Sequence, residues 1–283
     1  IPPLRSPCTM PHKKACWQVA KAVGDNMKRP LNIVDMHCHI DRMKNGVEVA
    51  RELAERGAGV LNATVLPSEY QEACDKFASM SNVWVGCGLH PWWVANGTAS
   101  SQDIKGAAAL ASECPIVGEI GLDFSARFAG SEQRQLKALA SVLDACAERP
   151  IKGRIVTIHA TKAVGCVLNM LRDRDLIATG TCIFHWFSGT SDELAQARAE
   201  GCLFSINERM LKTKRGREYA RQIPVQQLLL ETDAPMQFDT CGSASRILNS
   251  LERTLRTLSE LHAISADELE RIIAHTGAAA LIS

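Results

Sequence analysis

Histidine and carboxylate residues stand close together in several short segments of this 283-residue chain. The first segment is Asp35-Met36-His37-Cys38-His39. Alternate side chains of an extended strand point to the same side, so His37 and His39 can bind one ion together. A single His-x-His pair is weak evidence, because a lone histidine is more often a structural hydrogen-bonding group. A metal site therefore needs further ligands elsewhere in the chain.

Further candidate ligands follow other apolar runs. Imidazole and carboxylate groups suit zinc, manganese, iron or magnesium, and a carboxylate can bridge two ions. Two cations about 3.5–4 Å apart can share a water, lower its pKa and stabilise the attacking and leaving oxygens. We therefore expect two divalent ions (Mg, Mn or Zn) and a candidate ligand set of His37, His39, Glu119, His159, His185 and Asp233.

The elements that must position these residues are eight short apolar runs rich in strand-forming residues. They span residues 31–40, 59–65, 83–89, 116–122, 155–159, 182–187, 202–206 and 228–232. Helix-length patterns separate them, for example at 47–56 and 131–148, and Ser265 with Glu268 forms a capping-box pattern before the last helix. This alternation predicts an α/β fold, a TIM-like (β/α)8 barrel in a single domain. The candidate ligands follow the carboxyl ends of strands, which form the active-site face of such a barrel.

Composition limits the choice of partners and of cellular compartment. The formal net charge is only +1, so a nucleic acid would have to be bound by a local basic patch. The 11 cysteines show no CxxC spacing and stand mostly in apolar runs, which favours a reducing, cytoplasmic location over a disulfide framework. No apolar run has the length of a membrane span. Residues 1–30 are proline-rich and are expected to be an N-terminal extension outside the core, with the barrel at 31–283.

Five segments resemble the TatD family of amidohydrolase-like, metal-dependent hydrolases: residues 35–41, 88–91, 118–123, 185–189 and 228–235. Their order and approximate spacing hold from residue 31 to the C-terminus. The resemblance implies that His37 and His39 bind a first ion, that His159 and His185 bind a second, and that Glu119 bridges them. It also implies that Asp233 binds the first ion and accepts the proton of the attacking water, so Asp233 and Glu119 are the expected catalytic residues. Members of the family are metal-dependent DNases, and a deoxyribonuclease is the function that the resemblance implies.

The substrate-binding loops depart from the family pattern. Ala160-Thr161-Lys162 stands where a Ser-Arg-Asp sequence is usual, and residues 236–242 lack the usual arginine and asparagine, so we interpret the chain as a divergent member. The resemblance places His90 toward the substrate, although a structural hydrogen bond beside Pro91 is an equal alternative. The remaining candidates for phosphate binding are Arg127, Lys162 and a basic loop with Lys212, Lys214, Arg215 and Arg217. Each cation also fits a solvated surface. Trp92 and Trp93 can stack a base or pack against a loop.

Three functions remain open at this point. The leading one is a DNase, with DNA as its partner. The second is an amidohydrolase-like enzyme that hydrolyses a small-molecule amide or ester, and the same metal ligands serve either reaction. The third is an inactive binding subunit of a multi-component protein system. An open basic groove favours nucleic acid, whereas a closed apolar pocket favours a small substrate.

Overall fold

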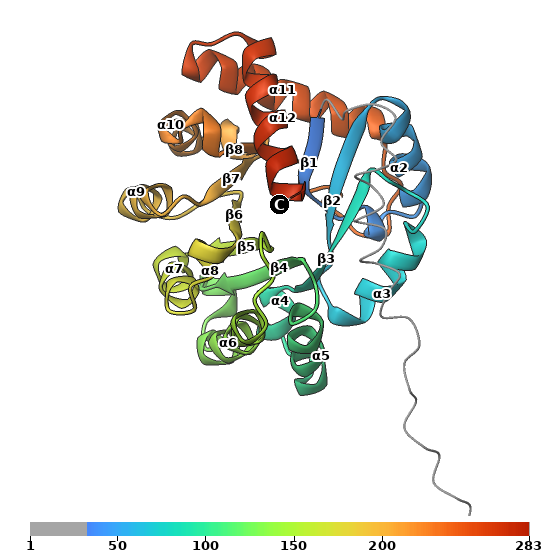
Figure 1. Ribbon diagram of the computed structural model, residues 1–283. Coiled ribbons are helices and arrows are strands. Elements are labelled where there is room, and N and C mark those ends of the chain that lie inside the picture. Colours follow the sequence, from blue (N-terminus) through green and yellow to red (C-terminus); the bar gives the residue numbers. More distant parts are fainter. Residues whose placement is uncertain (1–32, 283) are drawn as a thin grey trace, which may run out of the picture.

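The computed structural model describes residues 33–282 and shows eight parallel strands in sequence order, surrounded by helices (Figure 1). The strands are β1 (Ile33–Cys38), β2 (Ala58–Ala63), β3 (Val83–Leu89), β4 (Ile116–Asp123), β5 (Ile155–Thr161), β6 (Thr181–His185), β7 (Leu203–Ile206) and β8 (Leu228–Leu230). The prediction of a single-domain (β/α)8 barrel is confirmed. The N-terminal extension predicted at residues 1–30 lies outside the described residues.

The helices between the strands cover the outside of the barrel. They are α2 (Gly46–Glu55), α3 (Pro67–Lys76), α4 (Pro91–Ala95), α5 (Ser101–Ala111), α6 (Glu132–Glu148), α7 (Val164–Arg172), α8 (Leu176–Thr179), α9 (Ser191–Ala199), α10 (Lys214–Gln222), α11 (Ala244–His262) and α12 (Ala266–Ile282). Within residues 33–282, four short 3-10 helices add to them: η1 (Ile40–Arg42), η2 (Ala126–Phe128), η3 (Met210–Lys212) and η4 (Val225–Gln227). As predicted, Ser265 caps the last helix, where its hydroxyl accepts a hydrogen bond from the Glu268 N–H.

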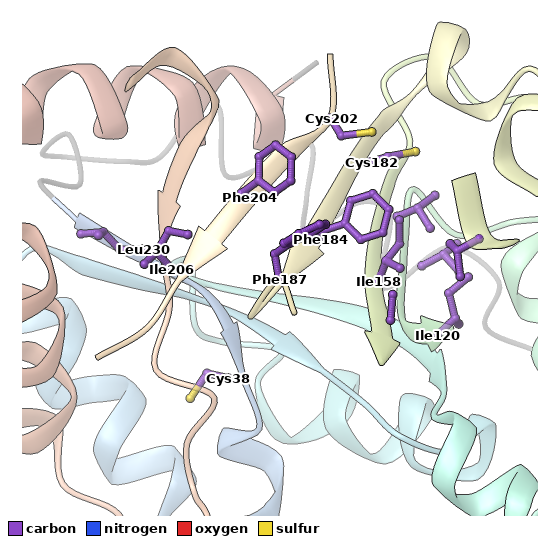
Figure 2. Packing of buried hydrophobic residues seen from close by; sticks show 14 of the residues in the cluster. Cys38, Ile120, Ile158, Cys182, Phe184, Phe187, Cys202, Phe204, Ile206 and Leu230 are labelled. Atoms are coloured by element: carbon purple, nitrogen blue, oxygen red, sulfur yellow. The ribbon is translucent and has the colours of Figure 1, made fainter. Parts of the chain in front are cut away.

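The core has an outer layer, between strands and helices, and a smaller layer inside the barrel. In the outer layer Phe184 and Phe204 of neighbouring strands pack with Phe187, and Cys182 and Cys202 fill the space beside them (Figure 2). These cysteines are buried free thiols and behave as small apolar side chains. Inside the barrel, side chains of the strands pack with Ala280 of α12. Helix α12 therefore covers the end of the barrel opposite the candidate ligands.

The barrel closes differently between β8 and β1 than elsewhere. Neighbouring strands from β1 to β8 are paired in parallel ladders, but within residues 33–282 no ladder joins β8 to β1. The Asp233 N–H instead donates to the His37 carbonyl (2.9 Å), and the Asp35 carboxylate accepts from the Thr232 N–H (3.0 Å). Because these bonds join the chain beside His37 to the chain beside Asp233, the closure also sets the distance between two candidate ligands.

Candidate metal centre

The structure brings all six candidate ligands together at the carboxyl ends of the strands. Four belong to strands, namely His37 in β1, Glu119 in β4, His159 in β5 and His185 in β6. His185 is the last residue of β6, while His39 and Asp233 stand just beyond the ends of β1 and β8. His37, His39, Glu119 and His185 are buried, in line with a closed ligand cluster at the bottom of the barrel mouth.

The Glu119 carboxylate lies at the centre of the cluster. Its Oε2 is 3.2 Å from His37 Nε2 and 3.6 Å from His39 Nε2. Its Oε1 is 2.9 Å from His185 Nε2 and 3.1 Å from His159 Nδ1. Each oxygen therefore faces different histidines of the candidate set, and Oε1 also faces His90.

Asp233 completes the group around the first histidine pair. Its Oδ1 is 3.4 Å from His39 Nε2 and 3.9 Å from His37 Nε2. The ligand atoms of these three residues all lie within 4.8 Å of one another. The Asp233 side chain is 18% exposed, whereas that of Glu119 is 2% exposed. Of these two carboxylates, Asp233 is the one that reaches the solvent of the mouth.

His90, which follows β3, also belongs to the cluster. Its Nε2 is 3.1 Å from Glu119 Oε1, and its Nδ1 accepts a hydrogen bond from the Trp92 N–H (3.1 Å). His90, Glu119 and His159 form another group whose ligand atoms lie within 4.8 Å of one another, as do His37, Glu119 and His185. The hydrogen bond expected beside Pro91 is therefore present, and the other ring nitrogen of His90 is directed at Glu119. A contact of His90 with the substrate stays a prediction.

The spacing of the ligand atoms fits bound cations. Two nitrogen or oxygen ligands at about 2.0–2.2 Å from one cation are roughly 3.0–3.4 Å apart in tetrahedral or octahedral geometry. The contacts of Glu119 with the four histidines, from 2.9 to 3.6 Å, span this range. The buried cluster of histidine, glutamate and aspartate residues is therefore able to bind metal.

Several second partners fix the histidine rings. His37 Nδ1 is 2.9 Å from the Thr157 hydroxyl, and His39 Nδ1 is 2.5 Å from the Ala63 carbonyl. His159 Nε2 is 3.2 Å from Asp123 Oδ2. Such contacts set the ring orientation and tautomer of a metal-binding histidine.

A buried carboxylate, that of Glu231, also lies behind His185. Glu231 Oε1 is 3.6 Å from His185 Nδ1, and the Asn207 amide donates to the same oxygen (2.7 Å). Sequence reasoning did not assign roles to Thr157, Asp123 or Glu231. The available signal was their position, because Asp123 and Glu231 belong to the same motif segments as Glu119 and Asp233.

Mutual interactions shift the pKa values of the cluster. Burial lowers the pKa of His39, but the Asp233 hydrogen bond and the Glu119 charge outweigh it and raise the pKa to about 9. Burial raises the pKa of Glu119, yet the surrounding histidines, His90 first, bring it well below its usual value. The pKa of His90 itself falls to about 4 because of burial. The carboxylates are thus ionised, and a cation has to displace protons from histidine rings as it binds.

Glycine residues allow the strands to approach closely around the ligands. Gly121 has a φ of +147°, and a Cβ atom there would lie 1.9 Å from the His159 carbonyl oxygen. At Gly88 a Cβ atom would lie 1.7 Å from the Thr64 carbonyl oxygen and 2.7 Å from the Glu119 nitrogen. A side chain at either position would therefore push β4 away from its neighbours and displace Glu119 or His159.

The candidate substrate-binding cations lie further out. Arg127 of η2 and Lys162, which follows β5 with a φ of +54°, are exposed. The expectation of a basic loop after β7 is wrong. Lys212 ends η3, while Lys214, Arg215 and Arg217 belong to α10, since Thr213 caps that helix by accepting from the Gly216 N–H. The four basic side chains are exposed, and Arg215 also donates to the Ser188 carbonyl (2.6 Å).

The two tandem tryptophans have different surroundings. Trp93 packs against the hydrophobic core, and its indole nitrogen is buried without a hydrogen-bond partner. Trp92 is half-buried at the cluster, where its indole N–H donates to Asp123 Oδ2 (2.7 Å). Packing thus accounts for Trp93, whereas Trp92 borders the site.

None of the helices within residues 33–282 has both the length and the apolar character needed to cross a membrane.

Comparisons with known proteins agree with the motifs. The family model for TatD related DNase matches residues 34–279. The 3'-5' ssDNA/RNA exonuclease TatD of Yersinia pseudotuberculosis is 31% identical over 221 residues, covering 75% of this chain and 78% of that protein. The protein of the same name from Salmonella typhimurium is 30% identical over 190 residues, covering 66% and 71%.

Solved structures share the fold. YjjV, a TatD homolog from Escherichia coli K12, superposes with a TM-score of 0.74 at 20% identity and covers 89% of this chain and 98% of its own. A TatD family hydrolase from Entamoeba histolytica gives a TM-score of 0.69 at 16% identity and covers 87% and 96%. The family model extends over almost all of the described residues and includes every candidate ligand. The chain belongs to the TatD-related DNase family.

Proposed function

We propose that the chain is a metal-dependent deoxyribonuclease that hydrolyses phosphodiester bonds with two divalent cations. The observation that carries this proposal is the division of ligands at Glu119: its Oε2 faces His37 and His39, whereas its Oε1 faces His159 and His185, with His90 beside them. Two cations joined by one carboxylate suit the displacement at phosphorus, since both the attacking and the leaving oxygen need stabilisation. The names of the relatives, which are single-stranded DNA and RNA exonucleases, support a nucleic-acid substrate.

Each ligand has a role in this proposal. His37, His39 and Asp233 hold one cation, His159 and His185 hold the other, and Glu119 bridges. When bound, the cations lower the pKa of an attacking water and offset the charge that develops on the phosphate oxygens. Asp233 accepts the proton of that water, because its carboxylate is the more exposed of the two. The buried Glu119 carboxylate positions the ligands and does not accept this proton. His90 helps to position Glu119 through its contact with Oε1, the oxygen that also faces His159.

The outer cations bind the nucleic-acid backbone in this proposal. Arg127, Lys162, Lys214 and Arg215 are exposed, and guanidinium and ammonium groups pair well with phosphate. Arg215 stands in the first turn of α10, so the partial positive charge of a helix N-terminus adds to its own. A cytoplasmic location and protein partners in a multi-component system stay predictions from the sequence.

The test uses the purified full-length chain with Mg²⁺, Mn²⁺ or Zn²⁺ on single-stranded DNA, double-stranded DNA, RNA and bis-p-nitrophenyl phosphate. We expect cleavage of DNA that stops in EDTA. Mass spectrometry of bound metal should find two equivalents in the wild type and one in His185→Ala, which removes a ligand from a single pair. Turnover of an amide or ester without cleavage of any phosphodiester would favour the small-molecule alternative. Unchanged metal content in His185→Ala would contradict the assignment of the second site.

A further inference from the structure

Arginine side chains lie over aromatic rings at the edge of the metal centre. The Arg127 guanidinium is 5.0 Å from the centre of the Trp92 ring, and the Arg42 guanidinium is 4.7 Å from the centre of the Phe238 ring. Such pairs are surfaces on which unpaired bases can stack, with an arginine that can also bind phosphate.

The two pairs differ in whether the arginine charge is available to bind a ligand. Arg42 forms an ion pair with the Glu69 carboxylate, which neutralises it. Arg127 is exposed, and no carboxylate within residues 33–282 forms an ion pair with it. Trp92 with Arg127 therefore offers a ring and an unneutralised cation at one place.

The Trp92 ring is also fixed relative to the cluster. Its indole N–H donates to Asp123 Oδ2, and the same oxygen is 3.2 Å from His159 Nε2. Its ring centre is 5.0 Å from that of His90 and 6.0 Å from that of His159. A group bound by Trp92 would thus lie next to the ligand set of the second proposed cation, in an orientation that exists before the substrate binds.

We propose that Trp92 and Arg127 form a nucleotide subsite beside the scissile phosphate. The base stacks on the surface made by the indole and the guanidinium above it, while the guanidinium N–H groups bind the neighbouring phosphate. This inference rests on the proposed nuclease function and adds a base contact to it, for which the nucleotide must be unpaired, because a base inside a duplex has no free face for stacking. It assigns Trp92 a function as a specificity-determining residue in addition to its hydrogen bond with Asp123.

The experiment compares Trp92→Ala and Trp92→Phe on single-stranded oligonucleotides that carry one abasic position at each of the terminal nucleotides in turn. In the wild type, one abasic position should raise KM. Trp92→Ala should raise KM for the intact strand by about 5- to 150-fold, the range of a lost base stack. The same variant should lose nothing further on the strand that is abasic at that position. Trp92→Phe keeps a ring and loses the N–H donor, so it should retain most of the binding.

Arg127→Ala tests the phosphate contact separately. Its slope of log affinity against log salt should be flatter by roughly 0.7, the value for one phosphate contact to a single strand, whereas Trp92→Ala should leave the slope unchanged. Arg149→Ala is the matched control. Arg149 is an exposed arginine at the end of α6 that pairs with Glu113, and its removal should change neither KM nor the slope. Metal content and turnover of bis-p-nitrophenyl phosphate should stay at wild-type values in Arg149→Ala.

Two results would overturn the subsite. One is an equal loss in Trp92→Ala on intact and abasic strands, together with an equal loss in Trp92→Phe, which would make Trp92 only a hydrogen-bond donor to Asp123. The other is an unchanged salt slope in Arg127→Ala. Both require a wild-type enzyme that cleaves oligonucleotides. If the wild type cleaves none of them with any of the three metals, the proposed nuclease function itself fails.

Discussion

At the scale of single residues, two further carboxylates stand behind those of the metal centre. Asp35 holds Thr232, the residue before Asp233, through the backbone N–H and the hydroxyl of Thr232. The Glu231 Oε1 atom lies 3.6 Å from Nδ1 of His185, the last residue of β6. Burial raises the pKa of Asp35 to about 7, against the opposing effect of its hydrogen bonds with Thr232. A buried carboxylate is costly unless several donors satisfy it, and here those donors are the groups that place the ligands.

Asp123 offers the sharpest test of such a positioning role. Burial raises its pKa, but the hydrogen bonds from His159 and Ser125 bring the pKa below the usual range, so it is an anion at neutral pH. Asp123→Asn should weaken metal binding by about 10- to 100-fold, because His159 loses the charged partner that orients it. Calorimetric titration of the metal measures this. Asp144→Asn, which alters an exposed carboxylate paired with Arg174, should bind metal as the wild type does. Equal metal affinity in Asp123→Asn and the wild type would show that His159 needs no orienting anion.

At the scale of elements, the ligand geometry depends on how closely β4 runs beside its neighbours. The ladder between β3 and β4 shifts its register between Cys87 and Leu89, and the ladder between β4 and β5 shifts between Val117 and Ile120. Both irregularities flank Glu119 and turn its side chain into the barrel mouth.

Gly121→Ala tests this close approach. The added Cβ would meet the His159 carbonyl at 1.9 Å, and φ of +147° suits only glycine. We expect a loss of several degrees in Tm and weaker metal binding, since β4 and β5 carry two of the ligands. Gly106→Ala in α5 is the matched control, because the nearest atom to its added Cβ is the Pro67 Cβ of α3, 3.7 Å away. That control should be neutral or stabilising by about 0.5–1 kcal/mol. A Gly121→Ala protein with wild-type Tm and metal affinity would contradict the account.

Two helices that follow ligand-bearing strands are joined at their N-termini by Glu193. Its Oε2 accepts from the Thr190 N–H at the start of α9 (2.7 Å), and its Oε1 accepts from the Gly165 N–H of α7 (2.8 Å). Glu193→Ala should cost about 1 kcal/mol of unfolding free energy at pH 7, the usual value of a helix cap.

The pH dependence of this cost follows from the pKa of Glu193. Burial raises that pKa, but the backbone hydrogen bonds from Thr190 and Gly165 outweigh it and lower the pKa below its usual value. A lowered folded pKa means that the stabilisation is complete above the unfolded pKa of about 4.3 and is lost as pH falls through the folded value. Denaturant unfolding of the wild type and of Glu193→Ala between pH 7 and pH 3 should therefore give a difference in unfolding free energy that becomes smaller as the pH falls. A difference in unfolding free energy that stays constant or grows as the pH falls would contradict the role of the ionised Glu193 carboxylate.

At the scale of the whole molecule, the fold and the six candidate ligands follow from the sequence because each signal is local. Buried parallel strands are short and apolar, so they can be recognised in the sequence, and the residues at their carboxyl ends follow directly from their positions. The partners Thr157 and Asp123 could not be assigned in this way, since their contacts join different strands and depend on register. The basic segment after β7 was expected as a loop for a related reason. Lys214 and Arg215 begin a helix whose cap, Thr213, is a weak signal beside so many charges.

The most direct test is metal-dependent hydrolysis of a single-stranded oligonucleotide by the 283-residue chain. The protein is stripped with EDTA, then titrated with Mn²⁺ while product and bound metal are measured together. We expect no cleavage before metal is added, full activity once two equivalents are bound, and loss of activity in Asp233→Asn with its fold retained. Cleavage that persists in EDTA, or two bound equivalents with no cleavage of any phosphodiester, would contradict the proposed function.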